Sequence, residues 1–272
     1  MGKQKLRIGK FTYSNLFPLF YMLEKKCDCS MYEFVGGVPS TLNKLIRTGK
    51  IDVSPSSSIE YLRCGEKYSL LDGHSISSDG PVRSILLFTK KPIAALDGHT
   101  ILTSSHSETS VALLEIILRK YYRVRCKLKS AEVTHKSGAS DVDAYLLIGD
   151  DALKAMKYYS DKVRKPGFIS YDLGELWRKY ARLPFTYALW IYRKDLSEEK
   201  SELMIRLKED LDYAKKLAHK NLRKIAKESP MNGILTEEEI VTYWKSISYD
   251  FGDEYKKGLE LFRKYSKELG LI

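Results

Sequence analysis

Hydroxyl side chains are concentrated in one short stretch of the sequence, between an apolar pair and an apolar run. Ile101-Leu102 is followed by six Ser or Thr residues within eight positions, and the apolar run from Val111 to Leu118 comes next. This pattern predicts a strand, a polar turn and a helix that starts between Ser105 and Thr109. A helix start has unpaired N–H groups and partial positive charge, so hydroxyls there can cap the helix or help bind a carboxylate or phosphate. One hydroxyl is enough for a cap, so six favour an anion site.

Three other groups of small polar residues lie in the first third of the chain. They are Tyr13–Asn15, Ser54–Ser58 and Ser75–Ser84. The first and third are predicted to be loops, and the second is predicted to start a helix that covers Ile59–Cys64. In parallel α/β sheets, ligands bind beyond the carboxyl ends of the strands, where such segments meet.

The composition is that of a globular protein with a small-molecule ligand rather than a nucleic-acid or membrane protein. No window approaches the roughly 20 apolar residues of a membrane helix, and no basic block or nucleic-acid-binding motif occurs in the 272 residues. Residues from Ser197 on hold 15 basic and 15 acidic residues, so residues 1–196 carry the whole net charge of +11. A positive site for a small anion explains this asymmetry, as does a lysine-rich solvated surface. We expect reduced cysteines and, without a signal-peptide core, a cytoplasmic location.

The order of predicted elements indicates an α/β fold. Strands are predicted at Lys5–Lys10, Ser30–Val35 and Ile51–Val53, each followed by a helix, and this alternation favours a largely parallel sheet. A second series of strands and helices follows Lys90–Ile93. The C-terminal section is helical, with an apolar stripe of the kind that packs on a core. That stripe contains Leu203, Leu207, Leu211, Ala214 and Ala218.

These features predict a two-lobed clamshell resembling type II periplasmic binding proteins, with a helical C-terminal section. The first part of lobe I covers residues 1–89, lobe II covers 90–186, and residues 187–272 return to lobe I with the C-terminal helices. In this architecture the ligand is expected between the lobes.

An ordered set of segments resembles the chorismate dehydratase family of the futalosine route to menaquinone. The segments, from about Arg7 to Trp190, are RIGKFTYSNLFPLFYML, GGVPSTLNKLIRTGKIDVSPSSSIEYLR, SISSDGPVRSILLF, ILTSSHSETSVALLEIIL, LLIGDDAL and YDLGELWRKYARLPFTYALW. The resemblance implies loss of water from chorismate to give 3-[(1-carboxyvinyl)oxy]benzoate, with no metal or organic cofactor. The sister enzyme 1,4-dihydroxy-6-naphthoate synthase shares the fold, but the SSIEY and SDGPVRS segments are closer to the dehydratase.

Chorismate is a dianion, so two places are expected to bind carboxylates. The predicted helix start offers Ser107, Thr109 and Ser110 for one of them, and Ser56, Ser57 or Ser58 can serve the other, unless one is only a helix cap. The resemblance implies that Asn15 and Ser84 act on the reacting part of the substrate. From the residues alone, Asn15 can equally be a residue that forms a loop, and Ser84 can be a small residue on a packed strand.

No clear general base accompanies these residues. His74 and His106 lie near the polar segments but in no recognisable pair with a carboxylate, Asp150 is expected to cap a helix, Asp79 to form a turn, and Glu60 to face outward. We therefore hypothesise that the enolpyruvyl carboxylate of the substrate takes the proton. A non-catalytic binding protein for a small organic anion and the naphthoate synthase remain alternatives. The sequence does not indicate an oligomeric state.

Overall fold

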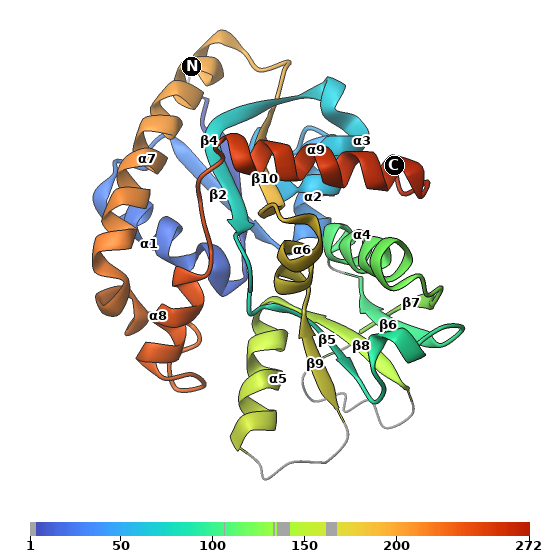
Figure 1. Cartoon of the computed structure of the whole chain (residues 1–272). Helices are drawn as coiled ribbons and strands as arrows, with labels where there is room; N and C mark the ends of the chain where they lie inside the picture. The colour runs from blue at the N-terminus through green and yellow to red at the C-terminus, as the bar shows by residue number, and fades with distance from the viewer. Residues whose placement is uncertain (1–3, 106, 133, 135–141, 162–167) are drawn as a thin grey trace. The chain divides into compact units, whose positions relative to one another are not determined.

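The computed structural model describes residues 4–105, 107–132, 134, 142–161 and 168–272 (Figure 1). His106, one of the histidines considered above, lies outside the described residues. The chain divides into two compact units, each assembled from separate segments. Unit 1 comprises Met1–Ile76, Ala188–Trp244 and Tyr249–Phe251, and unit 2 comprises Ser77–Tyr187, Lys245–Ser248 and Gly252–Ile272. The lobe boundaries at residues 89 and 186 stay a prediction.

The sheet of unit 1 is mixed and has the strand order β2-β1-β3-β10-β4. β1 runs parallel to β2 and β3, whereas β10 runs antiparallel to β3. The strands are β1 (Leu6–Phe11), β2 (Tyr32–Gly37), β3 (Val53–Ser57), β4 (Tyr68–Ser78) and β10 (Phe185–Arg193).

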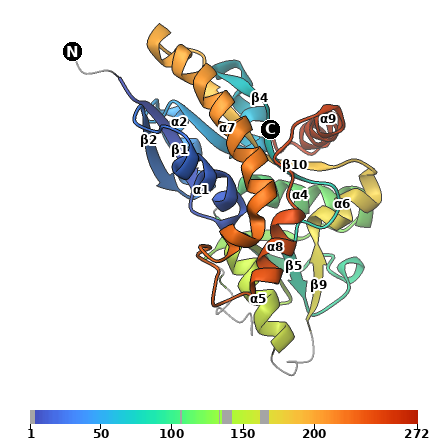
Figure 2. The ribbon, with the colours of Figure 1, turned by 90° about the vertical axis from the view of Figure 1, so that its left-hand side faces the viewer.

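The helices of unit 1 pack along this sheet. They are η1 (Ser14–Leu16), α1 (Phe17–Lys26), α2 (Pro39–Arg47), α3 (Ser58–Cys64), η2 (Gly65–Lys67), α7 (Glu198–Ala226) and α8 (Glu237–Lys245). α1 and α7 lie side by side (Figure 2). The predicted apolar stripe of α7 is buried at Leu207, Leu211, Ala214 and Ala218, but in the first turns Met204 is buried and Leu203 is only half-buried.

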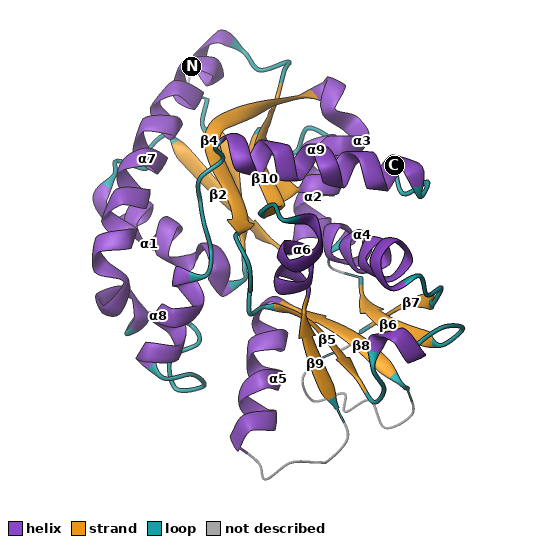
Figure 3. Ribbon diagram, in the orientation of Figure 1, coloured by secondary structure: helices purple, strands orange, loops and turns teal. Residues whose placement is uncertain are grey.

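The sheet of unit 2 is also mixed, with the order β7-β6-β8-β5-β9 (Figure 3). β6 is parallel to β7 and β8, and β5 is antiparallel to β8 and β9. The strands are β5 (Ile85–Thr89), β6 (Thr100–Ser104), β7 (Lys127–Ala131), β8 (Ala144–Ile148) and β9 (Ile169–Asp172). The helices are η3 (Ile93–Ala95), α4 (Glu108–Ile116) with its π-helical extension η4 (Ile117–Tyr122), α5 (Gly149–Asp161), α6 (Leu173–Ala181) and α9 (Asp253–Glu268).

Two predicted boundaries are wrong, and long-range pairing explains both. Ser75–Ser78 form the end of β4 rather than a loop, because the N–H groups of Ser75 and Ser77 donate to the carbonyls of Tyr249 and Ser248 at 2.9 Å. Ser54–Ser57 extend β3 rather than open a helix, because they pair with β10. The prediction of a largely parallel sheet is also wrong, because both sheets contain antiparallel as well as parallel pairs. Among the described residues, no helix has the length and apolar character needed to cross a membrane.

His74 is a buried titratable group in β4. Its side chain is inaccessible, and its two ring nitrogens have no hydrogen-bond partner among the described residues, although Nε2 lies 3.3 Å from Oδ1 of Asp212. Burial lowers the pKa of His74 to about 4, and the nearby Lys215 ammonium acts in the same direction, while Asp212 opposes it. The imidazole is therefore neutral in the folded protein at neutral pH.

We predict that this histidine weakens the fold in acid. The unfolded chain binds a proton near pH 6.5 and the folded chain only near pH 4, so stability is full above pH 6.5 and falls as the pH drops toward 4. The expected contribution is a loss of about 2 kcal/mol in the free energy of unfolding between pH 8 and pH 5. Urea unfolding of the protein and of His74→Gln measures it, with the exposed His219→Gln as the matched control. An equal loss in all three proteins would contradict the prediction.

Candidate functional site

In unit 1, the polar residues singled out from the sequence gather at one edge of the sheet. β1 and β3 are parallel neighbours, so the chain leaves both strands at the same edge. Asn15 lies in η1, four residues after the end of β1, and Ser56-Ser57 end β3. Three of the predicted substrate contacts and one of the two predicted reacting residues therefore belong to this edge.

Hydrogen bonds from distant residues fix the backbone of the turn that carries Asn15. The side-chain oxygen of Asn15 has no such bond from the described residues. Nε1 of Trp244 donates to the carbonyl of Ser14 at 2.9 Å, and the hydroxyl of Tyr249 donates to the carbonyl of Asn15 at 2.6 Å. The side-chain oxygen Oδ1 of Asn15 is buried and accepts no hydrogen bond from the described residues. Such an acceptor is suited to a ligand that brings its own donor.

The three serines after β3 are not equivalent. Ser57 is the N-cap of α3: its hydroxyl accepts from the N–H of Glu60 at 3.4 Å and from Nδ2 of Asn43 at 2.8 Å. Asn43 also accepts from the N–H of Ser57 at 3.2 Å. Ser58 is fully buried as the first residue of α3. The fully buried Ser56 has a hydroxyl with no partner among the described residues, so Ser56 keeps the most hydrogen-bonding capacity for a ligand.

Glu60 supports this turn and does not face solvent. The expectation that it faces outward is wrong, because its side chain is 1% exposed. Its carboxylate accepts hydrogen bonds from Arg47 on α2 and from the hydroxyl of Tyr68 at 2.9 Å. Burial, followed by the bond to Glu60, raises the pKa of Tyr68. Glu60 therefore ties α3 to α2 and β4 as a paired structural carboxylate.

In unit 2, a second set of predicted residues gathers at one edge of the sheet. β6 and β8 are parallel and end at Ser104 and Ile148, while the antiparallel β5 begins at Ile85 opposite Ile148. Ser84 therefore lies at the edge where β6 leads into α4. The carbonyl of Ser84 accepts from the N–H of Gly149 at 2.7 Å, and its hydroxyl lies 3.4 Å from the carbonyl of Val82.

The predicted helix start between Ser105 and Thr109 is confirmed. Ser107 is the N-cap of α4, and its hydroxyl accepts from the N–H of Ser110 at 3.3 Å and lies 2.9 Å from the Ser110 hydroxyl. Thr109 and Ser110 are buried, at 1% and 2% exposure. The N–H groups of this first turn and the helix dipole create a positive potential at the edge that Ser84 shares.

Asp172, which the sequence analysis did not single out, holds the segment before Ser84. Its carboxylate accepts from the N–H groups of Val82 (3.1 Å), Arg83 (2.6 Å), Gly174 (2.8 Å) and Glu175 (3.1 Å). It thus caps α6 and also fixes Arg83, which has a left-handed φ of 64°. Burial raises the pKa of Asp172, although these four N–H groups oppose the shift. The spacing of Asp172 and Glu175, three residues apart, could have revealed this site in the sequence, because such a pair is typical of a helix start.

Of the remaining carboxylates near the predicted segments, Asp79 lies in a bend after β4, in agreement with the predicted turn, whereas Asp150 is not at its predicted position. Asp150 is the second residue of α5 and not its cap, because the helix begins at Gly149. Asp79 forms an ion pair with Arg178 at 2.7 Å. Within the described ranges, no group of three or more His, Cys, Asp or Glu side chains could hold a metal ion.

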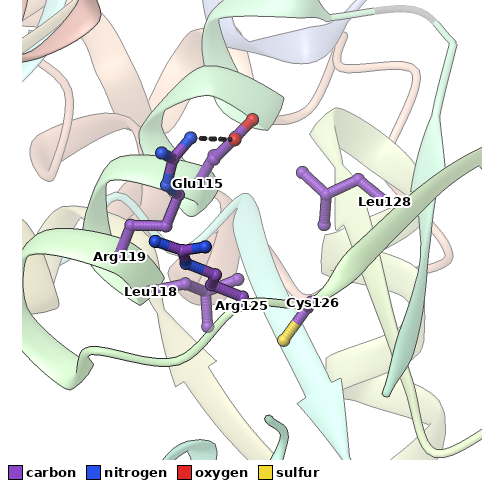
Figure 4. Close-up of a pocket in the computed structure, with 6 residues that line it drawn as sticks. All are labelled: Glu115, Leu118, Arg119, Arg125, Cys126 and Leu128. Atoms are coloured by element: carbon purple, nitrogen blue, oxygen red, sulfur yellow. Dashed lines mark hydrogen bonds and ion pairs between the residues drawn. The ribbon is translucent and has the colours of Figure 1, made fainter. Parts of the chain in front are cut away.

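A cavity of about 290 Å³ in unit 2 lies away from the Ser84 edge (Figure 4). Arg125 and Cys126 reach it from the segment that leads into β7, where Lys127 pairs with Thr100 at the start of β6. The cavity is therefore at the other end of the strands from Ser104. Arg119, in its wall, pairs with Glu115 at 2.9 Å. Burial raises the pKa of Cys126 to about 11, so the thiol is not activated.

The fold is that of the periplasmic binding proteins. The chain is similar over 98% of its length to protein AF1704 from Archaeoglobus fulgidus, with 98% of that chain covered, 21% identity and a TM-score of 0.79. It is also similar over its whole length to the alkanesulfonate-binding protein SsuA from Xanthomonas axonopodis pv. citri, bound to MOPS, with 95% of that chain covered, 16% identity and a TM-score of 0.71. The α/β class and the fold predicted from the sequence are confirmed.

Residues 6–268 match the family described as menaquinone biosynthesis, and the chain belongs to this family. Over 203 residues it is 30% identical to the chorismate dehydratase of Thermus thermophilus. The aligned region covers 69% of this chain and 70% of that protein. The family resemblance drawn from the sequence is therefore confirmed.

We predict that Asp172 is among the most important single residues for the stability of unit 2. Asp172→Ala removes four hydrogen bonds to a charged acceptor, and we expect a loss of about 2–4 kcal/mol in the free energy of unfolding. The matched control is Ser197→Ala, an exposed cap of α7 that accepts one N–H at 3.4 Å, with an expected loss of about 1 kcal/mol or less. Urea unfolding measures both. Similar losses in the two variants would show that Asp172 is only a cap.

Proposed function

We propose that the protein is a chorismate dehydratase. The observation that carries the proposal is its membership of the menaquinone biosynthesis family together with 30% identity to the Thermus thermophilus chorismate dehydratase. The reaction removes a proton from C3 and the hydroxyl from C4 of chorismate, which forms water, an aromatic ring and the intact enolpyruvyl ether. This makes the protein a hydro-lyase of the futalosine route. A cytoplasmic location is part of the proposal, and cell fractionation with an antibody tests it.

Substrate binding is assigned to the two polar edges. In the proposal, one carboxylate of the substrate accepts hydrogen bonds from the first turn of α4, through N–H groups and the hydroxyls of Ser107, Thr109 and Ser110. Ser56, Ser57 and Ser58 belong to the unit 1 edge, and the unpaired hydroxyl of Ser56 makes it the strongest of the three for a ligand contact. Ser57 then acts mainly through the shape of the turn.

Asn15 and Ser84 are proposed to act on the departing C4 hydroxyl. The unpaired Oδ1 of Asn15 can accept a hydrogen bond from a hydroxyl and hold it in one orientation. Ser84 is 5% exposed, and Asp172 fixes the residues before it, so its hydroxyl has a defined position. Orientation of this kind lowers an activation barrier without any change in protonation of the protein.

The proton acceptor is proposed to be the enolpyruvyl carboxylate of chorismate itself. Glu60 is tied to Arg47 and Tyr68, and Asp79 to Arg178, so these two carboxylates are engaged in structural pairs. His74 is sealed from solvent in β4. A carboxylate held close to C3–H in a site with little water is a stronger base than the same group in solution.

We predict that the purified protein converts chorismate to 3-[(1-carboxyvinyl)oxy]benzoate, measured by chromatography with mass detection. Asn15→Ala is expected to lower kcat at least about 100-fold, since a misplaced leaving group costs rate and not only affinity. Thr109→Val is expected to raise KM with a smaller effect on kcat, because it removes a contact made equally to substrate and transition state.

The alternatives give different results in the same assay. The alkanesulfonate-binding neighbours leave room for a non-catalytic protein, which would bind chorismate in calorimetry and release no product. Turnover of cyclic dehypoxanthinylfutalosine instead of chorismate would identify the naphthoate synthase. Lys200→Ala, on α7 and paired with Asp52, is a control that should leave kcat and KM unchanged.

We predict that Asp150 is not the base. Asp150→Asn preserves the shape of the side chain in the first turn of α5 but removes its capacity to accept a proton near neutral pH. If the substrate supplies the base, kcat should stay within about threefold of the wild type, and its pH profile should keep its form. A fall of several orders of magnitude in a folded Asp150→Asn protein would assign the proton transfer to Asp150.

A further inference from the structure

Two side chains from a distant part of unit 1 bind consecutive carbonyls of the turn that carries Asn15. The indole Nε1 of Trp244 donates to Ser14 at 2.9 Å, and the hydroxyl of Tyr249 donates to Asn15 at 2.6 Å. The ring of Phe17, which follows the turn directly, stacks on Trp244 with the centroids 6.1 Å apart and the planes 16° from parallel. Trp244 and Tyr249 thus contact η1 at two consecutive residues, and Trp244 also contacts the first residue of α1.

Tyr249 is itself held in place. Its side chain is 3% exposed, and its own carbonyl accepts from the N–H of Ser75 in β4 at 2.9 Å. The hydroxyl of Ser75 donates to the carbonyl of the next residue, Asp250, at 2.5 Å. Burial raises the pKa of Tyr249, so the phenol is a protonated donor at neutral pH. The bond to Asn15 therefore links η1, through the backbone of Tyr249, to β4 at the edge of the sheet.

Asn15 needs such support because its side chain has none from the protein. Oδ1 is buried without a donor among the described residues, and a short 3₁₀ turn has poor hydrogen-bond geometry of its own. A loop held only by its ends would rotate this oxygen toward water or a neighbouring donor. The two long-range bonds, one to the carbonyl of Ser14 and one to that of Asn15, fix the backbone from which the side chain projects, and neither of them engages its amide.

We propose that Tyr249, assisted by Trp244, is a positioning residue that fixes the backbone of Asn15 and thereby the direction of its side-chain oxygen. The catalytic part of this inference rests on the proposed function, because it assigns to Asn15 the departing hydroxyl. The structural part, that Tyr249 sets the environment of the Asn15 amide, does not.

Tyr249→Phe tests the inference, since it removes one hydroxyl and keeps the ring. We expect kcat for chorismate to fall about tenfold or more while KM changes less than about threefold, because the turn stays formed but is less well oriented. Tyr32→Phe is the matched control. Tyr32 is equally buried, its hydroxyl donates to Asp210 at 2.6 Å, and it lies at the start of β2, opposite Leu6 and so at the other end of the strands from Asn15. We expect it to lower the melting temperature by a similar amount and to keep kcat.

A double-mutant cycle separates positioning from general loss of packing. In an Asn15→Ala background, Tyr249→Phe should lower kcat no further, because the residue through which Tyr249 acts is gone. Equal effects of Tyr249→Phe in both backgrounds, or equal effects of Tyr249→Phe and Tyr32→Phe on kcat, would overturn the proposal. Trp244→Phe, which removes the bond to the neighbouring carbonyl, is expected to change kcat in the same direction.

An NMR measurement keeps the test independent of the reaction. The side-chain amide signal of Asn15, assigned by its absence in Asn15→Ala, should shift in Tyr249→Phe and stay in place in Tyr32→Phe. If the wild type does not convert chorismate but the signal responds in this way, the dehydratase proposal fails and the positioning role stands. If the signal is unchanged in Tyr249→Phe, the positioning role fails, whatever the activity.

Discussion

The carboxylate of Asp172 is the interaction on which the polar edge of unit 2 depends. Four N–H groups converge on it, two from the start of α6 and two from the segment that leads into β5. A half-buried carboxylate with four donors is most favourable while all four are in place, because each missing donor leaves charge less well compensated. The left-handed Arg83 is thereby fixed, and Ser84 follows at a defined position beside Gly149.

In unit 1 a neutral pair of side chains, Asn43 and Ser57, stabilises the turn between β3 and α3. Asn43 binds both the N–H and the hydroxyl of Ser57, and Ser57 in turn caps α3. In both units a polar side chain, Asp172 or Asn43, thus satisfies backbone groups where a strand passes into a helix. The residues beside it keep unused capacity: the hydroxyl of Ser56 and the amide oxygen of Asn15 accept nothing from the described residues. Most buried polar groups in proteins are paired, so these two unpaired acceptors are suited to a ligand or a water molecule.

The sequence was sufficient for features that depend on local chemistry. The helix start between Ser105 and Thr109 and the buried stripe of α7 from Leu207 on follow from neighbouring residues, and they are where they were expected. Predictions were wrong or missing for features that depend on pairing between distant residues. Ser75–Ser78 have the composition of a loop, yet the carbonyls of Ser248 and Tyr249 complete a strand there. Glu60 is buried because Arg47 and Tyr68 reach it from other elements. No periodicity in the sequence predicts the hydrogen bond from Tyr249 to Asn15, because 234 positions separate the two residues.

The proposed elimination relies on orientation of the substrate because of where the difficulty of the reaction lies. Chorismate gains aromaticity when it loses water, so the driving force is within the substrate, and the barrier lies in bringing a base to C3–H while the C4 hydroxyl is held. A rigid edge that fixes one carboxylate removes freedom from the other, and an effective concentration gained in this way can be worth several kcal/mol. In the proposed mechanism, the hydroxyl, amide and N–H groups of Asn15, Ser84 and the first turn of α4 do not change charge during the reaction. If the enolpyruvyl carboxylate is the base, as proposed, the protein contributes orientation and fixed dipoles rather than a titrating side chain.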